Sequence, residues 1–293
     1  MRRFTILGAL IALGVATTIG QPVAQGNVAE IEQVKGNLYV IMGGGGNTGA
    51  FVTDGGVVVV DTKNPGWGSA ILDKIKTVTS KPVTMVINTH THGDHVGSNI
   101  DFPAGIEVVA HVNTKTNMER MEAFQTTSGR GYLPGQTYSD KLTLLSGDDS
   151  IDLYHFGAGH TSGDSIVVFR ALRVAHTGDL FAWKGVPYID VDNGGSGVSY
   201  PETLEAAANG ISGVDTVIPG HSPVMTWDDF REFGEFNRDF LSAVRREKAG
   251  GKTAAQAATS LNLPARYANY AMSRGTLTSA EDNATKIYEE LDR

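Results

Sequence analysis

The stretch "NTHTHGDHVGSN", residues 88–99, decides how the rest of the chain is interpreted. The chain has 8 histidines among 293 residues, yet His90, His92 and His95 all fall here, with Asp94 beside them. Neutral imidazoles and a carboxylate are favoured zinc ligands. Because residues two apart on an extended segment point the same way, His90 and His92 can bind one ion together. A turn at the intervening glycine can aim Asp94 and His95 at a second position. The pattern therefore favours a metal site over a chance cluster of histidines on the surface.

The segments before this stretch predict an α/β fold. Residues 57–62, "VVVVDT", have the continuous apolar run of a strand buried on both faces. Residues 66–80 carry apolar side chains at helical spacing, and residues 83–89 return to a strand pattern that leads into the histidines. A strand–helix–strand order predicts parallel pairing, with helices covering the sheet. Asp54-Gly55-Gly56 predicts a hairpin turn before the first of these strands.

Three later strand ends carry further side chains of the ligand type. "FGAGHTSGD" places His160 after an expected strand, "AHTGDLF" places Asp179 at the end of another, and "VIPGHSP" places His221 after the last. Sites in α/β proteins assemble at the carboxyl ends of strands. The cluster at residues 90–95 and these three side chains are therefore expected to converge.

In this order the motifs closely resemble those of the metallo-β-lactamase superfamily. The resemblance rests on His-X-His-X-Asp-His at residues 90–95, the three later side chains, and Asp61 at the end of "VVVVDT", and it covers roughly residues 31–226. It implies a four-layer αββα sandwich with two metal ions at one edge between the sheets. The helical pattern after residue 226 adds a C-terminal extension to this α/β fold.

The resemblance also implies a role for each residue. Asp179 would bridge two zinc ions, Asp94 would orient a bridging hydroxide and relay its proton as the catalytic residue, and Asp61 would fix the cluster loop through hydrogen bonds. The first ion would be held by His90, His92 and His160, and the second by Asp94, His95 and His221. Iron or manganese in one of the two positions stays an alternative.

Composition narrows the class of protein. The formal net charge of −8 argues against nucleic acid as a partner. The absence of cysteine means that any metal must be bound through nitrogen and oxygen. Arg2 and Arg3 followed by the apolar residues 4–16 predict a signal peptide over residues 1–25 and a periplasmic or secreted protein. The apolar run is too short to span a bilayer, so no stable membrane insertion is expected after cleavage.

Two regions are expected after the signal peptide, a hydrolase domain over residues 26–226 and a helical extension over residues 227–293. Thr226 with Asp229, and Ser279 with Asp282, have the spacing of helix caps. The extension can pack on the sandwich, shape the substrate entrance or form a homodimer contact, and the sequence leaves these alternatives open.

The expected reaction is hydrolysis of an ester, lactone, thioester or amide-type bond in a small molecule. An aspartate at position 179 resembles the glyoxalase II, lactonase and phosphodiesterase branches, although Ala182 stands where quorum-quenching lactonases carry a tyrosine. Export favours the alternative of a periplasmic β-lactamase, and a non-catalytic zinc-binding or sensor protein is the alternative of another class. Lys184 and Tyr188 are candidates for binding a substrate carboxylate or an oxyanion, or else a solvated lysine and a packed tyrosine.

Overall fold

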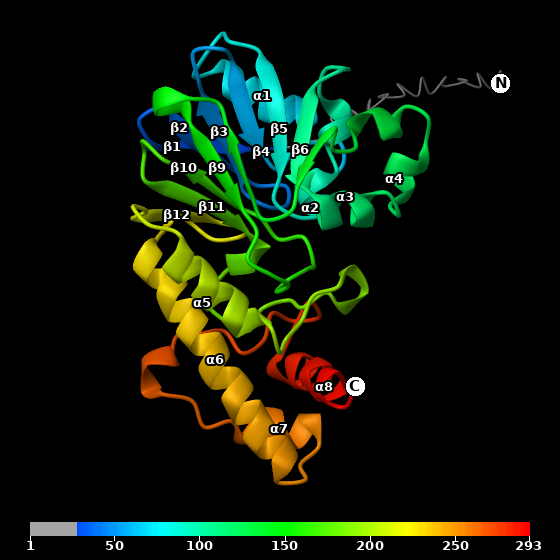
Figure 1. Ribbon diagram of the computed structural model, residues 1–293, viewed down its shortest axis with the longest axis vertical. Helices are drawn as coiled ribbons and strands as arrows, with labels where there is room; N and C mark the ends of the chain where they lie inside the picture. Colours follow the sequence, from blue (N-terminus) through cyan, green and yellow to red (C-terminus); the bar gives the residue numbers. More distant parts are fainter. Residues whose placement is uncertain (1–27) are drawn as a thin grey trace, which may run out of the picture.

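The computed structural model describes residues 28–293, and the signal peptide expected over residues 1–25 lies outside them. Two β-sheets lie face to face in the upper half of Figure 1, and a group of helices occupies the lower half. Among the helices of residues 28–293, none has the length and apolar character that a membrane crossing requires.

The first sheet has seven strands in sequence order. They are β1 (Glu30–Lys35), β2 (Leu38–Met42), β3 (Thr48–Val52), β4 (Val57–Val60), β5 (Val83–Asn88), β6 (Glu107–His111) and β7 (Gln136–Tyr138). The predicted hairpin is confirmed, since β3 and β4 pair antiparallel. The predicted crossover is confirmed as well: helix α1 (Gly68–Lys76) connects β4 to β5, and these two strands pair in parallel.

The second sheet has six strands in the order β13-β12-β11-β10-β9-β8. They are β8 (Lys141–Leu144), β9 (Ile151–Tyr154), β10 (Ile166–Phe169), β11 (Val174–Gly178), β12 (Thr216–Pro219) and β13 (Met225–Thr226). The connection from β11 to β12 includes helix α5 (Tyr200–Gly210), and these two strands pair in parallel. The parallel pair places the carboxyl ends of both strands at one edge, from which Asp179 and His221 follow.

The layers follow from where apolar side chains are buried. Val58 and Val60 point into the cluster between the two sheets, whereas Val57 and Val59 belong to the cluster under α1. A strand with apolar groups on both faces must be covered on both, which explains the unbroken valine run. The order is therefore helix, sheet, sheet, helix, and the predicted αββα sandwich is confirmed.

Sequence patterns missed the strands at the sheet edges. β1 is largely exposed, β7 has three residues, and β8 alternates polar and apolar side chains. Between β6 and β7 the chain forms two short helices, α3 (Val112–Met118) and α4 (Glu122–Gln125). The His111 ring accepts a hydrogen bond from the Asn113 backbone at the start of α3.

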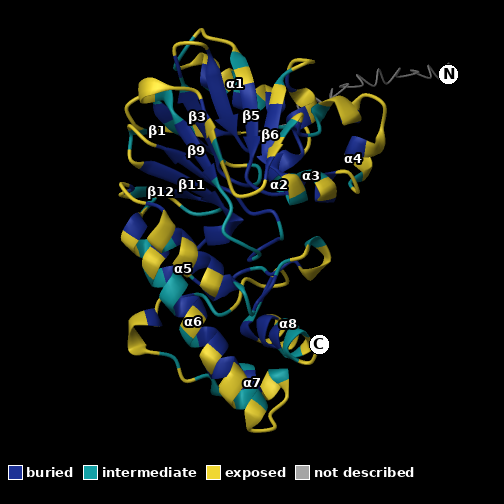
Figure 2. Cartoon of the chain, viewed as in Figure 1, coloured by how far each residue is buried: buried dark blue, intermediate teal, exposed yellow. Residues whose placement is uncertain are grey.

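The C-terminal extension contains α6 (Trp227–Ala249), α7 (Ala254–Ser260) and α8 (Ala280–Leu291). The capping box of Thr226 and Asp229 is confirmed at the start of α6. One hydrophobic cluster joins the extension to the second sheet, since Phe230 and Ile287 belong to the same cluster as Val168. Figure 2 shows the buried side of these helices turned inward, and α6 lies beside α5, so the two helices together cover that sheet.

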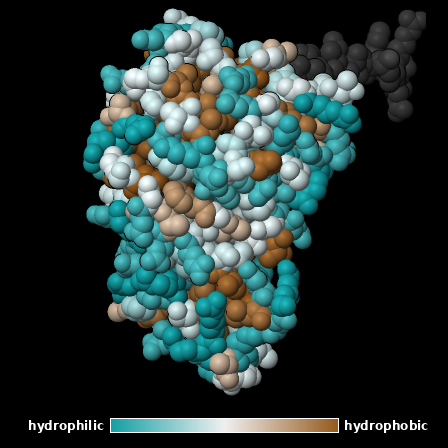
Figure 3. Space-filling model, in the orientation of Figure 1, coloured by the Kyte–Doolittle hydropathy of each residue, from teal (hydrophilic) through white to brown (hydrophobic). Residues whose placement is uncertain are grey.

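The visible surface is of mixed polarity. On the face shown in Figure 3, hydrophobic side chains form separate patches between hydrophilic ones. The large hydrophobic side chains that are exposed are scattered along the described chain, as is normal for a folded domain. One of them, Leu277, is 50% exposed and lies beside the candidate site.

Candidate metal centre

All seven predicted ligands converge at the edge where strands of both sheets end. Short helix α2 (Gly93–Val96) begins just after β5, and His92 precedes it in an extended conformation. This turn separates the directions of His92 and His95, as the glycine between them suggested. Asp179 follows β11 directly, and His221 lies just past the end of β12. Asp179 and the six other side chains form two adjoining groups that can each hold an ion.

The first group consists of His90, His92, His160 and Asp179. The His160 Nε2 and His92 Nδ1 atoms are 2.9 Å apart, and His160 Nε2 is 3.7 Å from Asp179 Oδ2. His90, His160 and Asp179 are buried, and His92 is half-buried. Such convergence of nitrogen and oxygen atoms in a buried site is the donor arrangement of a transition-metal ion.

Oxygen atoms behind the histidines orient the rings of the first group. His160 Nδ1 lies 2.6 Å from the Tyr188 carbonyl, and His92 Nε2 lies 2.6 Å from Asp190 Oδ2. His90 Nδ1 contacts the Thr89 hydroxyl at 2.9 Å. Each outer nitrogen therefore donates its proton to oxygen, which leaves the inner nitrogen with a lone pair directed at the site.

The second group consists of Asp94, His95 and His221. His95 and His221 approach each other with 3.2 Å between their Nε2 atoms. Asp179 reaches this group too, with its Oδ1 3.3 Å from His95 and its Oδ2 3.3 Å from His221. Asp179 thus contacts members of both groups, as a bridging ligand would.

Asp61 lies behind the clusters rather than between them. Its Oδ2 accepts hydrogen bonds from the Thr89 hydroxyl and from His95 Nδ1, and its Oδ1 accepts one from the Thr89 backbone. Asp61 therefore orients His95 directly and His90 through the Thr89 hydroxyl. A third set of potential ligands, Asp61 with His90 and His95, is better understood as this supporting network.

The charges of the site call for a cation. Burial favours neutral histidine, but Asp179 and Asp61 raise the pKa of His95 well above its ordinary value. Burial is likewise outweighed at His221, where Asp179 and Asp94 raise the pKa to about 9. In the first group burial dominates and lowers the pKa of His160 to about 3. The carboxylates therefore favour positive charge at the histidines of the second group, and a metal cation would supply that charge.

Unpartnered atoms point to the same conclusion. Within residues 28–293, His90 Nε2 is buried without a hydrogen-bond partner, and the buried Asp179 Oδ1 has only its 3.3 Å ion-pair contact with His95. Leaving such atoms unsatisfied is costly, and an ion between the groups would coordinate both. The residues present therefore fit divalent metal ions.

A glycine-rich loop over residues 43–46 supports the second group from behind. The Gly46 backbone donates to the Asp94 carbonyl, and a Cβ at Gly46 would lie 2.2 Å from His95 Cε1. Only glycine fits at such a close approach. The buried Lys63 amino group donates to the Gly46 and Ile41 carbonyls, each at 2.8 Å, and holds the loop in place. This loop therefore lies against the second group and keeps Asp94 and His95 in place.

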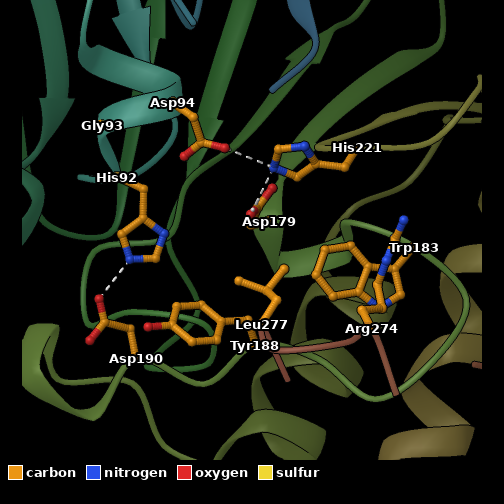
Figure 4. Close-up of a pocket in the computed structure, with 10 residues that line it drawn as sticks. All are labelled: His92, Gly93, Asp94, Asp179, Trp183, Tyr188, Asp190, His221, Arg274 and Leu277. Carbon is orange, nitrogen blue, oxygen red and sulfur yellow. Dashed lines mark hydrogen bonds and ion pairs between the residues drawn. The ribbon is translucent and has the colours of Figure 1, made fainter. Parts of the chain in front are cut away.

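The metal centre opens into a pocket of about 450 Å³ (Figure 4). Its lining includes Asp190, Trp183, Arg274 and Leu277, which sequence reasoning did not single out. Asp190 lies in an acidic segment, and no local pattern set it apart. Trp183, Arg274 and Leu277 lie in segments without a recognisable site pattern, and they meet at the pocket only through tertiary contacts.

The two predicted substrate contacts are placed differently. Tyr188 lines the pocket, and its ring lies 5.7 Å from those of His92 and His160. Lys184 is not among the lining residues. Its ammonium lies 2.6 Å from Asp229 and 3.0 Å from Glu232 of α6, so Lys184 is neither a pocket residue nor a solvated lysine, the two alternatives that the sequence left open.

The three remaining histidines, His111, His155 and His176, make hydrogen bonds or ring contacts outside the two groups. His176 Nε2 lies 3.1 Å from the Asn47 carbonyl, and His155 Nδ1 lies 2.9 Å from the Asp164 carbonyl. The rings of His111 and His155 stack with 3.8 Å between centroids.

Comparison with known proteins gives relatives by sequence. The family model described as the metallo-beta-lactamase superfamily matches residues 41–227. The alpha subunit of a 2,4-dinitroanisole O-demethylase from Nocardioides sp. (strain JS1661) is 31% identical over 153 residues, which are 50% of this chain and 45% of that protein. A hydroxyacylglutathione hydrolase from Synechocystis sp. (strain ATCC 27184 / PCC 6803 / Kazusa) is 29% identical over 40% of this chain and 41% of its own length. The chain thus spans less than half the length of these relatives.

Solved structures share the fold. The DIM-1 metallo-beta-lactamase has a TM-score of 0.59 and 18% identity, covering 72% of this chain and 97% of its own. A double mutant of the sec-alkyl sulfatase PisA1 has a TM-score of 0.70 and 15% identity, covering 90% of this chain and 50% of its own.

Proposed function

This chain belongs to the metallo-beta-lactamase superfamily and is a metal-dependent hydrolase, and we propose that it uses two zinc ions to cleave an ester, lactone, thioester or amide-type bond in a small molecule. The observation that carries the proposal is the position of Asp179. Its carboxylate contacts a histidine of the first group and two histidines of the second, which favours a shared ligand between two ions.

Two divalent ions held there would supply a nucleophile by lowering the pKa of coordinated water toward neutrality. The side chains of this chain provide orientation and proton transfer. Asp94 is suited to the second task, because its side chain is 32% exposed at the pocket and accepts from His221 at 3.3 Å. Burial opposes the charge of this carboxylate, but His221 and His95 hold the pKa of Asp94 below its ordinary value. It is therefore ionised near neutral pH and can accept a proton.

A thioester is the first substrate class to test. The hydroxyacylglutathione hydrolases are named for such substrates, and two of them match this chain. The aspartate at position 179 supported the same branch in the sequence. The pocket offers both polar groups near the metal centre and apolar side chains, including Trp183 and Leu277, for the remainder of a small molecule.

The proposal is tested by hydrolysis assays on the zinc-loaded protein without residues 1–25. The panel is an acyl-glutathione thioester, an aryl ester, a lactone, a chromogenic cephalosporin and a phosphodiester. We expect turnover of the thioester, ester or lactone, lost on chelation and restored by zinc. Turnover of the cephalosporin alone would instead identify a β-lactamase, and two bound ions without turnover of any substrate would favour a binding or sensor protein.

We also propose that the protein acts in the periplasm or outside the cell, on the basis of the basic and apolar residues 2–16. Expression with its own N-terminus, followed by mass spectrometry of the periplasmic or extracellular fraction, tests this. A mature chain that begins near residue 26 is expected. Full-length protein confined to the cytoplasm would contradict the proposal.

A further inference from the structure

A short β-hairpin in the extension forms one wall of the pocket. Ser273 and Ser279 form an antiparallel bridge, and Ala280 donates to the Met272 carbonyl at 2.8 Å. The Arg274 backbone donates to the Thr278 carbonyl at 2.8 Å, which closes the turn. Gly275 allows this turn because its φ is +61°. Arg274 and Leu277 belong to the turn, and both line the pocket.

The hairpin is fixed to the loop that carries the other pocket residues. Ala271 donates to the Lys184 carbonyl at 3.1 Å, and Val186 donates to the Ala271 carbonyl at 2.9 Å. The buried Thr278 hydroxyl donates to the Pro187 carbonyl at 2.9 Å. These bonds flank the turn on both sides, so its position relative to Tyr188 is set by the fold.

The Arg274 guanidinium is held over an aromatic ring in the pocket wall. Its central carbon lies 4.3 Å from the centroid of Trp183, and the two side chains lie together in Figure 4. The Trp183 indole donates to the Val186 carbonyl at 3.0 Å, which fixes this platform. Within residues 28–293, no ion pair involves Arg274, and it is the one lysine or arginine among the described residues that line the pocket. A stacked guanidinium retains its hydrogen-bond donors for an oxyanion.

We propose that Arg274 determines substrate specificity by binding an oxyanion group, such as a carboxylate, on the part of the substrate remote from the bond that is cleaved. This inference rests on the proposed function, because it concerns the pocket of the same metal centre. Leu277 and Tyr188 lie between Arg274 and His92 in Figure 4, and an apolar spacer in the substrate would contact them. Substrates with an anionic end and an apolar middle are therefore favoured over neutral ones.

The test compares two esters that differ in charge, 4-nitrophenyl hydrogen glutarate and neutral 4-nitrophenyl pentanoate. Arg274→Gln is expected to raise the KM for the glutarate ester by about 10-fold, because a charge-assisted hydrogen bond is lost. The kcat for this ester, and both kcat and KM for the pentanoate ester, should change little. Arg274→Lys keeps the positive charge and should retain part of the preference for the glutarate ester. Equal losses on both esters, or no change on the glutarate ester, would overturn the proposal.

Arg266→Gln is the matched control. Arg266 is also in the extension and also lies over a ring, 4.8 Å from the centroid of Tyr267, but it pairs with Glu235 and Asp239 away from the pocket. Arg266→Gln should leave kcat and KM for both esters unchanged, and all variants should retain the same metal content.

A binding measurement separates this inference from the proposed function. If the zinc-loaded protein hydrolyses neither ester, glutarate and butyl sulfate are titrated against the fluorescence of Trp183, with Trp183→Phe identifying its signal. If the Kd of either anion rises by about 10-fold in Arg274→Gln, the anion site is supported without any turnover. The anion with the lower Kd shows whether a carboxylate or a sulfate group is preferred. Binding unchanged by the substitution, or no binding, refutes it.

Discussion

The sandwich and the C-terminal extension contribute different things to one site. All seven candidate ligands come from residues 90–221, at the ends of strands and within the loops that follow. The extension contributes no candidate ligand among the described residues, but it supplies Arg274 and Leu277 to the pocket. The candidate ligands thus come from one part of the sequence, whereas the pocket wall is built from two, since Trp183 and Tyr188 are remote in sequence from the hairpin of the extension and join it in the lining.

The two regions also differ in how their parts are fixed. In the sandwich, ligand rings are oriented by short polar contacts such as that of Asp61 with His95. In the extension, α6 and its neighbours are held by a cluster of aromatic rings, in which Phe236 contacts Tyr267 and Tyr270. Loss of a polar contact should therefore change catalysis or metal affinity, whereas loss of an aromatic contact should change stability.

The largest expected effect is on catalysis by the sandwich. Asp94→Asn removes the proposed proton acceptor and should lower kcat by about 10²- to 10⁴-fold, the usual contribution of such a group. Metal content and the melting temperature, measured on the same preparation, are expected to show a folded protein with the first group still occupied. Activity close to that of the wild type would exclude Asp94 from proton transfer.

The next effect concerns the stability of the extension. Phe236 is buried in the cluster that α6 shares with the second sheet, so Phe236→Ala should lower the free energy of unfolding by about 3–5 kcal/mol. Because the cluster is continuous, a single thermal transition at lower temperature is expected. Phe51→Ala, which creates a similar cavity between the sheets, is the control. Two separate transitions in Phe236→Ala, with metal still bound after the first, would show that the regions fold independently.

These differences explain what the sequence could predict. Ligands at strand ends follow local patterns, because a buried strand and the polar residue after it are adjacent in the chain, as with Gly178 and Asp179. Lys184 and Arg274 have no such local signal. Lys184 stands near the ligands in sequence but meets α6, whereas Arg274 is remote in sequence and reaches the pocket through a hairpin. Which of these two side chains reaches the pocket depends on tertiary contacts, and the spacing of apolar residues in the sequence does not predict such contacts.

A smaller effect tests the polar support of a ligand. Asp190 accepts from His92 at 2.6 Å and also from the Asn193 side chain at 2.6 Å. Burial works against its charge, but these donors hold the pKa of Asp190 well below its ordinary value. Asp190→Asn should weaken zinc binding by about 10- to 100-fold, as loss of such supporting partners does. Competition with a zinc-binding dye measures this.

The exposed Asp192→Asn is the control for that substitution, because it changes the same charge two residues away. It should leave zinc affinity unchanged. An equal loss in both variants would mean that general electrostatics, rather than the contact with His92, sets the affinity.

The smallest effect concerns Lys63, which supports the glycine-rich loop. Burial lowers the pKa of Lys63 to about 7 despite the opposing attraction of Asp61 and Asp94. A neutral amine has two N–H donors, and the two carbonyls of Ile41 and Gly46 accept both. The unfolded chain keeps the ordinary pKa of 10.5, so it binds more protons than the folded chain between pH 7 and 10.5. Stability should therefore rise with pH in this window and not below it.

Lys63→Met removes the titrating group while keeping a long side chain. Between pH 7 and pH 8 the wild type should gain at most about 1.4 kcal/mol of unfolding free energy relative to this variant, measured by urea denaturation. Lys76→Met, at an exposed site on α1, should follow the wild type. Parallel curves for wild type and Lys63→Met would mean that Lys63 stays charged in the fold. In that case the loop beside His95 would be held by an ammonium group, and the sandwich would carry one more buried charge than the neutral amine implies.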